Sequence, residues 1–131
     1  MNDPLLILIA DPNPFVRSFL ARELSAHGYS TAEAGSGKEI LAQLYRKTLP
    51  DLLVMELDFP VSVGLMVLEK VQNLVPTVPQ IIYTHFTEYE NHPSVRKADD
   101  FIEKNEDPSD LLHSISEVIH MYKTNVARMK D

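Results

Sequence analysis

Polar residues that could do chemistry follow short apolar stretches at four places in the sequence. They are Asp11 after LLILIA, Glu56 and Asp58 at the end of LLVMEL, Thr84 after QIIY, and Lys104 after DFIE. Carboxylates can hold a divalent cation such as magnesium, which needs only one or two of them from the protein. Acids at two of these places, a hydroxyl at the third and an amine at the fourth form a more specific set than any one of these groups. Their chemistry depends on whether the chain brings them together.

The apolar pattern predicts five strands that alternate with helices. The strands are expected over residues 5–10, 29–34, 52–57, 80–83 and 100–103. Short continuous apolar runs such as LLILIA are typical of strands buried on both faces. The alternation predicts an α/β domain with a parallel sheet, helices on both faces and right-handed crossovers. Ligands in such sheets bind at the carboxyl ends of the strands, so the four polar positions are expected at one edge.

Apolar residues at helical spacing predict the intervening helices. The first begins at Pro14, the second opens at Ser36, and the third follows Gly64 and runs until Pro76. Serine favours the cap of a helix and proline its first turn. Farther along, Pro93 is expected to interrupt any helix, so the fourth element should be short and poorly ordered.

The last helix is predicted to be long. It starts at DPSD, with Asp107 as the cap and Pro108 in the first turn, and its apolar stripe continues to about residue 129. A heptad seam is matched by Leu111, Ile115, Val118, Tyr122 and Met129, with Asn125 in one slot. The seam covers fewer than three heptads, which supports a coiled coil only weakly. A frayed extension, a dimer and a linker helix to an output domain therefore stay open.

The composition fits one globular domain. The chain has 131 residues, of which 44% are hydrophobic, and no cysteine. A single domain over residues 1–131 is expected, with its core at about 5–120 and an extension of the last helix at 121–131. The net charge of −7 makes nonspecific nucleic-acid binding unfavourable. No apolar stretch approaches the length of a membrane span or a signal peptide, so a soluble cytoplasmic domain is expected.

From about Leu5 to Ile119 the sequence resembles the receiver domain of two-component response regulators. LLILIAD resembles the first strand with its acidic end, and PDLLVMELDFPVSVGLMVLEKV resembles the phosphoacceptor strand, its loop and the following helix. IIYT resembles the strand that ends in the switch Thr or Ser, and ADDFIEKN the strand with the switch aromatic and the active-site Lys. This resemblance implies a flavodoxin-like, doubly wound (βα)5 fold with strand order 2-1-3-4-5.

The resemblance also implies a chemistry, which is magnesium-assisted phosphoryl transfer to an Asp. In the family, the metal is held by an acidic pair after the first strand, by the phosphoacceptor and by a loop carbonyl. Here the phosphoacceptor position falls on Glu56, four residues before Pro60 and eight before Gly64. Asp11 matches the first acid of the pair, but the second position is Pro12, which has no side-chain ligand atom.

Other family positions are matched in type. Thr84, Phe101 and Lys104 fall on the switch hydroxyl, the switch aromatic and the Lys that pairs with phosphoryl oxygens. Asp58 falls at the loop position whose backbone carbonyl would face the metal. Asn105 replaces the Pro that normally follows the Lys, which puts the cis peptide of the family in doubt.

These departures predict a degenerate receiver, a non-enzymatic interaction module whose output does not depend on phosphorylation. One extra methylene moves the carboxylate of Glu56 by about 1 Å, which is enough to cost in-line transfer about two orders of magnitude. Glu56 is instead expected to form a standing ion pair with Lys104. No cofactor or metal is expected, although Asp11, Glu56 and Asp58 offer a weak magnesium site. The alternatives are a phosphorylatable receiver that uses Asp58 or Glu56 with magnesium, and a domain that binds a small ligand in the vacated pocket.

Partners are implied by the resemblance alone. A histidine kinase, an output domain or another signalling protein is expected to contact the face formed by the fourth helix, fifth strand and fifth helix. A homodimer through this face is also open, whereas nucleic acid and membrane are not expected.

Overall fold

The computed structural model describes residues 3–130, with side chains through Thr124. Five parallel strands form one sheet in the order β2-β1-β3-β4-β5, as the sequence predicts. The strands are β1 (Leu6–Ala10), β2 (Ser30–Ala34), β3 (Leu52–Met55), β4 (Gln80–Thr84) and β5 (Asp100–Glu103).

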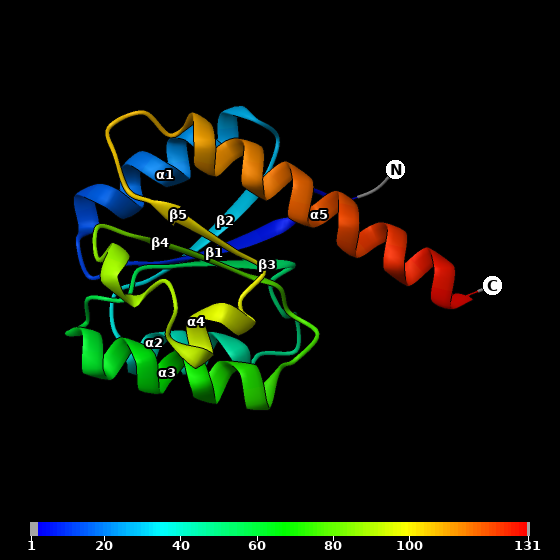
Figure 1. Cartoon of the computed structure of the whole chain (residues 1–131). Helices are drawn as coiled ribbons and strands as arrows, with labels where there is room; N and C mark the ends of the chain where they lie inside the picture. Colours follow the sequence, from blue (N-terminus) through cyan, green and yellow to red (C-terminus); the bar gives the residue numbers. More distant parts are fainter. Residues whose placement is uncertain (1–2, 131) are drawn as a thin grey trace.

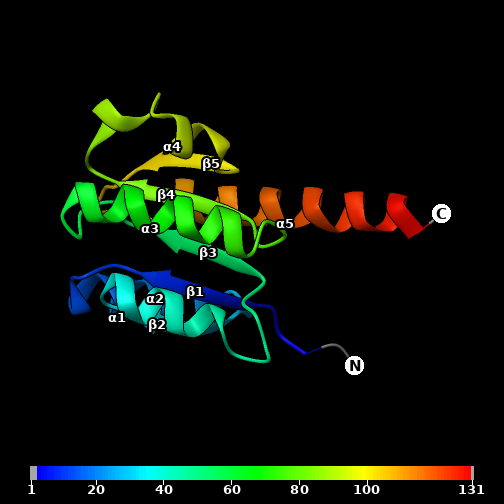
Figure 2. The same ribbon diagram turned by 90° about the horizontal axis from the view of Figure 1, so that it is seen from below.

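Helices cover both faces of this sheet (Figure 1). One face carries α1 (Pro14–Ala26) and α5 (Ser109–Lys130), and the other carries α2 (Gly37–Leu44), α3 (Val61–Leu74) and α4 (Pro93–Lys97). A 3-10 turn, η1 (Thr87–Tyr89), lies between β4 and α4. Figure 2 shows the second face, with α2, α3 and α4 packed across the strands.

Two apolar clusters hold the layers together. Alternate residues of a strand point to opposite faces of the sheet, and β1 feeds both clusters. Ile7 and Ile9 pack with α1 and α5, whereas Leu8 packs with α2 and α3. Each of these three side chains is almost fully buried. The continuous apolar runs of the sequence are therefore explained by a sheet that is covered on both sides.

The first two helices begin as predicted because their caps are satisfied. The side chain of Asn13 accepts a hydrogen bond from the backbone N–H of Phe15, and Pro14 occupies the first turn of α1. The hydroxyl of Ser36 accepts a hydrogen bond from the N–H of Glu39 at the start of α2. Such caps satisfy backbone donors that have no partner inside the helix.

Two predicted boundaries around the third helix are wrong. Strand β3 ends at Met55, so Glu56 lies in the following loop and not in a strand over residues 52–57. Helix α3 begins at Val61, three residues before Gly64, and not after it. Gly64 lies inside the helix, at a position where a Cβ atom would collide with the carbonyl oxygen of Leu57. The glycine allows a close approach to the site loop and is not a start signal.

Substitution of Gly64 by alanine should therefore destabilise the domain. The new methyl group would force the helix away from the loop that carries Glu56, and overpacking of this kind costs about 1–3 kcal/mol. Chemical denaturation of the variant measures the loss. Met66→Ala on the exposed side of the same helix is the control and should change the free energy of unfolding by less than about 0.5 kcal/mol. Equal stabilities for both variants would contradict the close approach.

The fourth helix also differs from the prediction. It is short, as expected, but Pro93 begins α4 and does not interrupt it. A ring nitrogen of His92 accepts a hydrogen bond from the N–H of Ser94, so the helix start is capped. Proline is favoured in a first turn because its missing N–H would have no partner there. The segment is therefore regular and not the poorly ordered stretch expected from the sequence.

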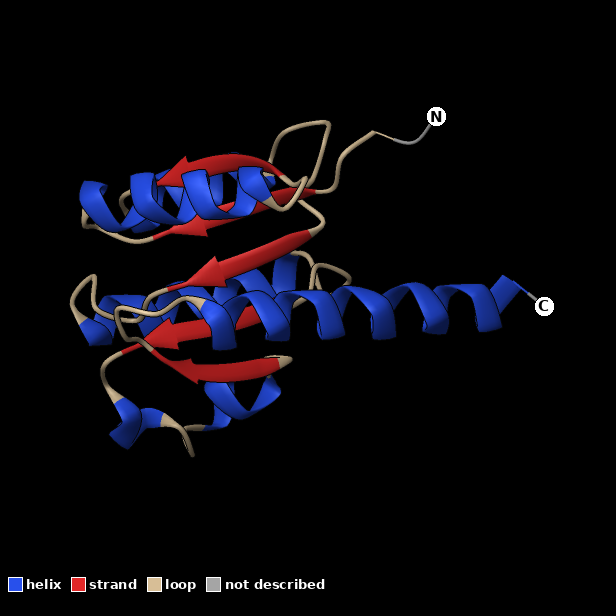
Figure 3. Ribbon diagram, turned by 90° about the horizontal axis from the view of Figure 1, so that it is seen from above, coloured by secondary structure: helices blue, strands red, loops and turns tan. Residues whose placement is uncertain are grey.

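The last helix is long, as predicted, and its final turns project beyond the strands (Figure 3). Leu111, Ile115 and Val118 of the predicted seam pack against the sheet, whereas Tyr122 is 38% exposed. The seam positions 125 and 129 lie outside the described side chains. The role of the extension thus stays a prediction. No helix in the described part of the chain is both long and apolar enough to cross a membrane.

Candidate functional site

Three of the predicted site residues meet at the carboxyl edge of the sheet. The ammonium group of Lys104 donates hydrogen bonds to Asp11 Oδ2 at 2.6 Å and to Glu56 Oε1 at 2.7 Å. The side chains of Lys104, Asp11 and Glu56 are only 10%, 5% and 6% exposed. The ion pair expected between Glu56 and Lys104 is present, and Asp11 shares the same cation. The result is a buried cluster with one positive and two negative charges.

The second oxygen of Glu56 is held by the loop that follows it. Glu56 Oε2 accepts hydrogen bonds from the backbone N–H groups of Leu57, at 2.6 Å, and Asp58, at 3.2 Å. Asp58 thus joins the site through its main chain, and the residue is exposed to solvent. The structure does not bring the Asp58 carboxylate into the cluster.

Asp11 is fixed from two sides. Its Oδ1 accepts a hydrogen bond from Asn13 N, and its carbonyl oxygen accepts one from Arg17 Nη1. Arg17 also forms an ion pair with Glu33 on β2, with 3.1 Å between Nε and Oε1. Sequence analysis missed Arg17, because a contact between a helix and a strand end has no local signal. Arg17 ties the loop of Asp11 to the neighbouring strand.

The ionisation of Glu56 is the outcome of opposed effects. Burial favours the neutral acid, but hydrogen bonds from Lys104 and Thr84, the charge of Lys104 and the N–H of Asp58 together hold its pKa below the ordinary value. For Lys104, burial favours the neutral amine, but hydrogen bonds and charge from Asp11 and Glu56 raise its pKa above the ordinary value. Both groups are therefore charged at neutral pH, as an ion pair requires.

This balance predicts how stability changes with pH. Because the pKa of Glu56 is lowered on folding, its contribution is present above its unfolded value and is lost as the pH falls through the folded value. Chemical denaturation should show unfolding becoming easier below about pH 4.5. In Glu56→Gln this acid-side slope should be shallower, whereas Glu69→Gln on the exposed surface of α3 should keep it. Parallel slopes for both variants and the parent would contradict a lowered pKa at Glu56.

The loop after β5 is positioned by a residue that sequence analysis did not single out. The hydroxyl of buried Tyr83 donates a hydrogen bond to the carbonyl oxygen of Asn105 at 3.2 Å. The Lys104 ammonium lies 5.8 Å from the centre of the Tyr83 ring, within the range of a cation–π contact. The Lys104–Asn105 peptide is trans, so Asn105 does not reproduce the cis peptide of the family. Tyr83 therefore contacts both the ammonium group of Lys104 and the loop that follows β5.

The remaining predicted residues lie around the cluster. Thr84 is fully buried, its hydroxyl lies beside Glu56, and its Oγ1 accepts a hydrogen bond from Phe86 N. Phe101 is half-buried and packs against the apolar cluster on the α3 side of the sheet. Pro12 is exposed and supplies no ligand atom at the position of the second family acid.

These residues do not fit a magnesium ion as they are arranged. All four carboxylate oxygens of Asp11 and Glu56 accept hydrogen bonds from protein N–H groups. The ammonium of Lys104 lies between the two acids and already compensates part of their charge. Among the residues that the structure describes, no three acidic or histidine side chains form a group that could hold a metal.

Comparison with known proteins decides the family. The family model described as "Response regulator receiver domain" matches residues 7–116. The chain belongs to the response regulator receiver family. This receiver is 34% identical over 125 residues to the transcriptional activator protein ExaE of Pseudomonas putida, covering 88% of the chain and 56% of ExaE. It is 27% identical over 120 residues to the regulator NtrC of Salmonella typhimurium, covering 90% of the chain and 25% of NtrC. The receiver thus spans about half of one relative and a quarter of the other.

Solved structures agree with this assignment. A CheY-like receiver domain protein from Methanospirillum hungatei is 27% identical, with a TM-score of 0.85 over 93% of this chain and 98% of that chain. TrrA from Thermotoga maritima, solved in complex with Mg(2+)-BeF, is 25% identical, with a TM-score of 0.80 over 86% and 97% of the two chains. The receiver fold is therefore shared almost completely by both.

Proposed function

We propose that this receiver transmits a two-component signal through protein contacts without accepting a phosphoryl group. The observation that carries the proposal is the engagement of Lys104 by both acids, which leaves no carboxylate oxygen of Glu56 without a donor. A nucleophilic carboxylate would have to give up its hydrogen bond to Lys104 inside a buried cluster, which opposes the reaction. Pro12 removes a metal ligand as well.

The competing function is phosphorylation at an atypical acid. Asp58 is exposed to solvent, but it is two residues beyond the position that faces Lys104. Glu56 has the right position in the sequence. Its longer side chain, however, displaces the carboxylate oxygens from the place that in-line attack on a phosphoryl group requires. The arrangement favours the first function because Lys104 is already neutralised by protein carboxylates.

Incubation with acetyl phosphate and magnesium separates the two functions. Intact-mass measurement should find the protein unmodified, because neither the acceptor geometry nor the metal site is complete. A stoichiometric phosphoryl adduct would overturn the proposal. Peptide mapping of such an adduct would then distinguish Glu56 from Asp58. The same protein unfolded in urea is the control for nonspecific modification by acetyl phosphate.

The contact face that we propose is formed by α4, β5 and α5. Strand β5 is an edge strand, and a hollow of about 490 Å³ lies between it and α5. The hollow is lined by acids from both elements, which are Asp100, Glu103, Asp110 and Glu117. Exposed Arg96 and Lys97 on α4 add the opposite charge to the same face. A face with both charge signs can bind a partner protein or a second copy with a defined register.

Its partner would be a histidine kinase, an output domain or another signalling protein. ExaE is a transcriptional activator, and CqsS of Vibrio cholerae, which is 29% identical over 115 residues, is a sensor kinase/phosphatase. The receiver covers 17% of CqsS, so receivers of this kind occur within longer chains. A covalently linked output domain and a separate protein are both compatible with the proposed face.

A further inference from the structure

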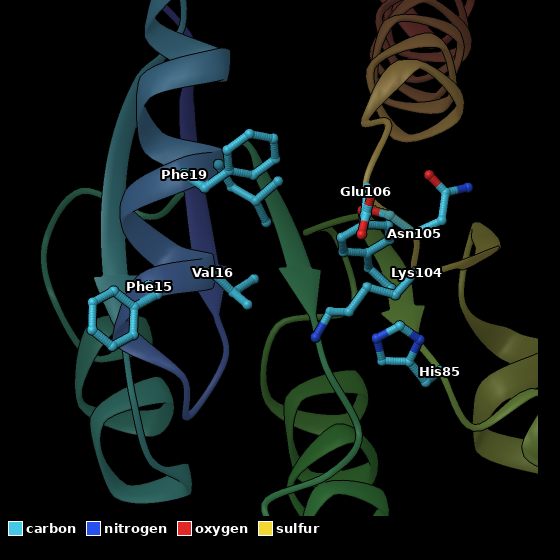
Figure 4. A pocket seen from close by; sticks show the side chains of 9 residues that line it. Phe15, Val16, Phe19, His85, Lys104, Asn105 and Glu106 are labelled. Carbon is cyan, nitrogen blue, oxygen red and sulfur yellow. The ribbon is translucent and has the colours of Figure 1, made fainter.

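A second hollow lies beside the charged cluster and is not used by the proposed function. It has a volume of about 650 Å³ and lies between α1 and the ends of β4 and β5. Figure 4 shows Val16 and Phe19 of α1 on one side, with His85, Lys104 and Glu106 on the other. The volume is in the range of about 300–1,000 Å³ that is typical of small-molecule sites.

The wall on the α1 side is apolar and incompletely covered. Val16 and Phe19 are half-buried and Leu20 is buried, whereas Phe15 at the rim is 83% exposed. The buried ring of Tyr83 also lines the hollow. Apolar side chains that line an open hollow favour an occupant with an apolar body, because contact removes both surfaces from water.

The other wall is polar and is lined by His85, Lys104, Asn105 and Glu106, so it carries one positive and one negative side chain. Lys104 is opposed by two carboxylates, those of Asp11 and Glu56, so this cluster has a net negative charge. Glu106 is exposed and forms no ion pair with any residue that the structure describes. No second Lys or Arg lines the hollow. An anionic occupant is therefore disfavoured, and a cation is attracted both by Glu106 and by the faces of the aromatic rings.

We propose that this hollow binds a small apolar molecule with one protonated amine, such as an arylalkylamine. The aryl group packs against Val16 and Phe19, and the ammonium group lies toward Glu106. The size of the hollow and the charges at its polar wall argue for this occupant together. This site shares only Asn105 with the hollow between β5 and α5, and absence of amine binding would leave the proposed function untouched.

Three matched probes test the charge requirement. They are naphthylethylamine, naphthylethanol and naphthylacetate, which share an aryl body and differ in charge. Titrations followed by amide NMR should show the amine shifting signals of α1 residues 15–20, His85 and Asn105. The amine should bind about fivefold or more tightly than the alcohol, and the acetate should bind more weakly than both. Ethylamine, which has no apolar body, should give no shifts at these residues.

Substitution of one exposed acid tests the location. In Glu106→Gln, the affinity for the amine should fall to that for the alcohol, while the affinity for the alcohol stays unchanged. Glu90→Gln, an exposed acid outside the hollow, is the matched control and should keep the preference. Absence of binding by the amine, equal binding of amine and alcohol, or shifts confined to another surface would each overturn the proposal. Unchanged amide spectra of the free variants show that the fold is intact.

Discussion

Replacement of Lys104 by methionine is expected to destabilise the receiver by about 3 kcal/mol. The substitution keeps a side chain of similar length but removes the only cation between Asp11 and Glu56, whose side chains are 5% and 6% exposed. Two carboxylates would then be buried side by side without compensation. Chemical denaturation at neutral pH measures the effect. Lys70→Met on the exposed surface of α3 is the matched control and should cost less than about 0.5 kcal/mol.

The same variant should reverse the pH dependence of stability at Glu56. In the parent, the ion pair lowers the pKa of Glu56 in spite of burial, so stability is lost as the pH falls. Without Lys104, burial dominates and raises that pKa, so stability is greatest at low pH and is lost as the pH rises through the raised value. Chemical denaturation should therefore find Lys104→Met more stable at about pH 5 than at about pH 8. The parent, with its ion pair intact, should not gain stability at the lower pH.

A second substitution shows whether the acid is responsible. Adding Glu56→Gln to Lys104→Met removes one of the two stranded charges and should recover part of the lost stability. If the double variant is less stable than Lys104→Met, the carboxylate of Glu56 is not the source of the cost. If Lys104→Met itself is as stable as Lys70→Met, the buried cluster contributes nothing measurable.

The sequence was sufficient for the parts of the fold that depend on local patterns. Apolar runs located the five strands, and Pro14 and Ser36 located the starts of the first two helices, because helix starts and buried strands leave a signal within a few residues. The predictions that rested on Gly64 as a helix start and on Pro93 as a helix break were wrong for the same reason. Each of these residues also has a role inside a helix, as a close contact with Leu57 or as a first-turn residue, and sequence alone does not separate these roles from breaks.

The site was predictable to a similar extent. Family spacing placed Glu56 and Lys104 at the carboxyl ends of two strands, and their opposite charges predicted the pair that the structure contains. Arg17 and Tyr83 were missed because they act through backbone carbonyls of Asp11 and Asn105. Any residue offers a carbonyl oxygen, so such contacts leave no trace in the identity of the partner. The burial that opposes the charge of Glu56 is likewise a property of the assembled sheet.

If Glu56 and Pro12 are the reason why the proposed receiver accepts no phosphoryl group, replacing both by aspartate should enable the transfer. In Glu56→Asp with Pro12→Asp, the shorter carboxylate moves away from Lys104 and a second acid stands next to Asp11. This restores the acid pair and the acceptor that the family resemblance assigns to magnesium and phosphoryl transfer. Incubation with acetyl phosphate and magnesium should then give a phosphoryl adduct at least about 100-fold faster than in the parent.

The single variants make this prediction decisive. Glu56→Asp alone supplies the acceptor without the metal ligand, and Pro12→Asp alone supplies the ligand while Glu56 keeps its contact with Lys104. Both should react much more slowly than the double variant, because acceptor and metal act on the same transferring group. Chelation of magnesium should abolish the adduct in the double variant. A folded double variant that stays unmodified would show that the cause lies elsewhere, with Asn105 and its trans peptide as the next position to change.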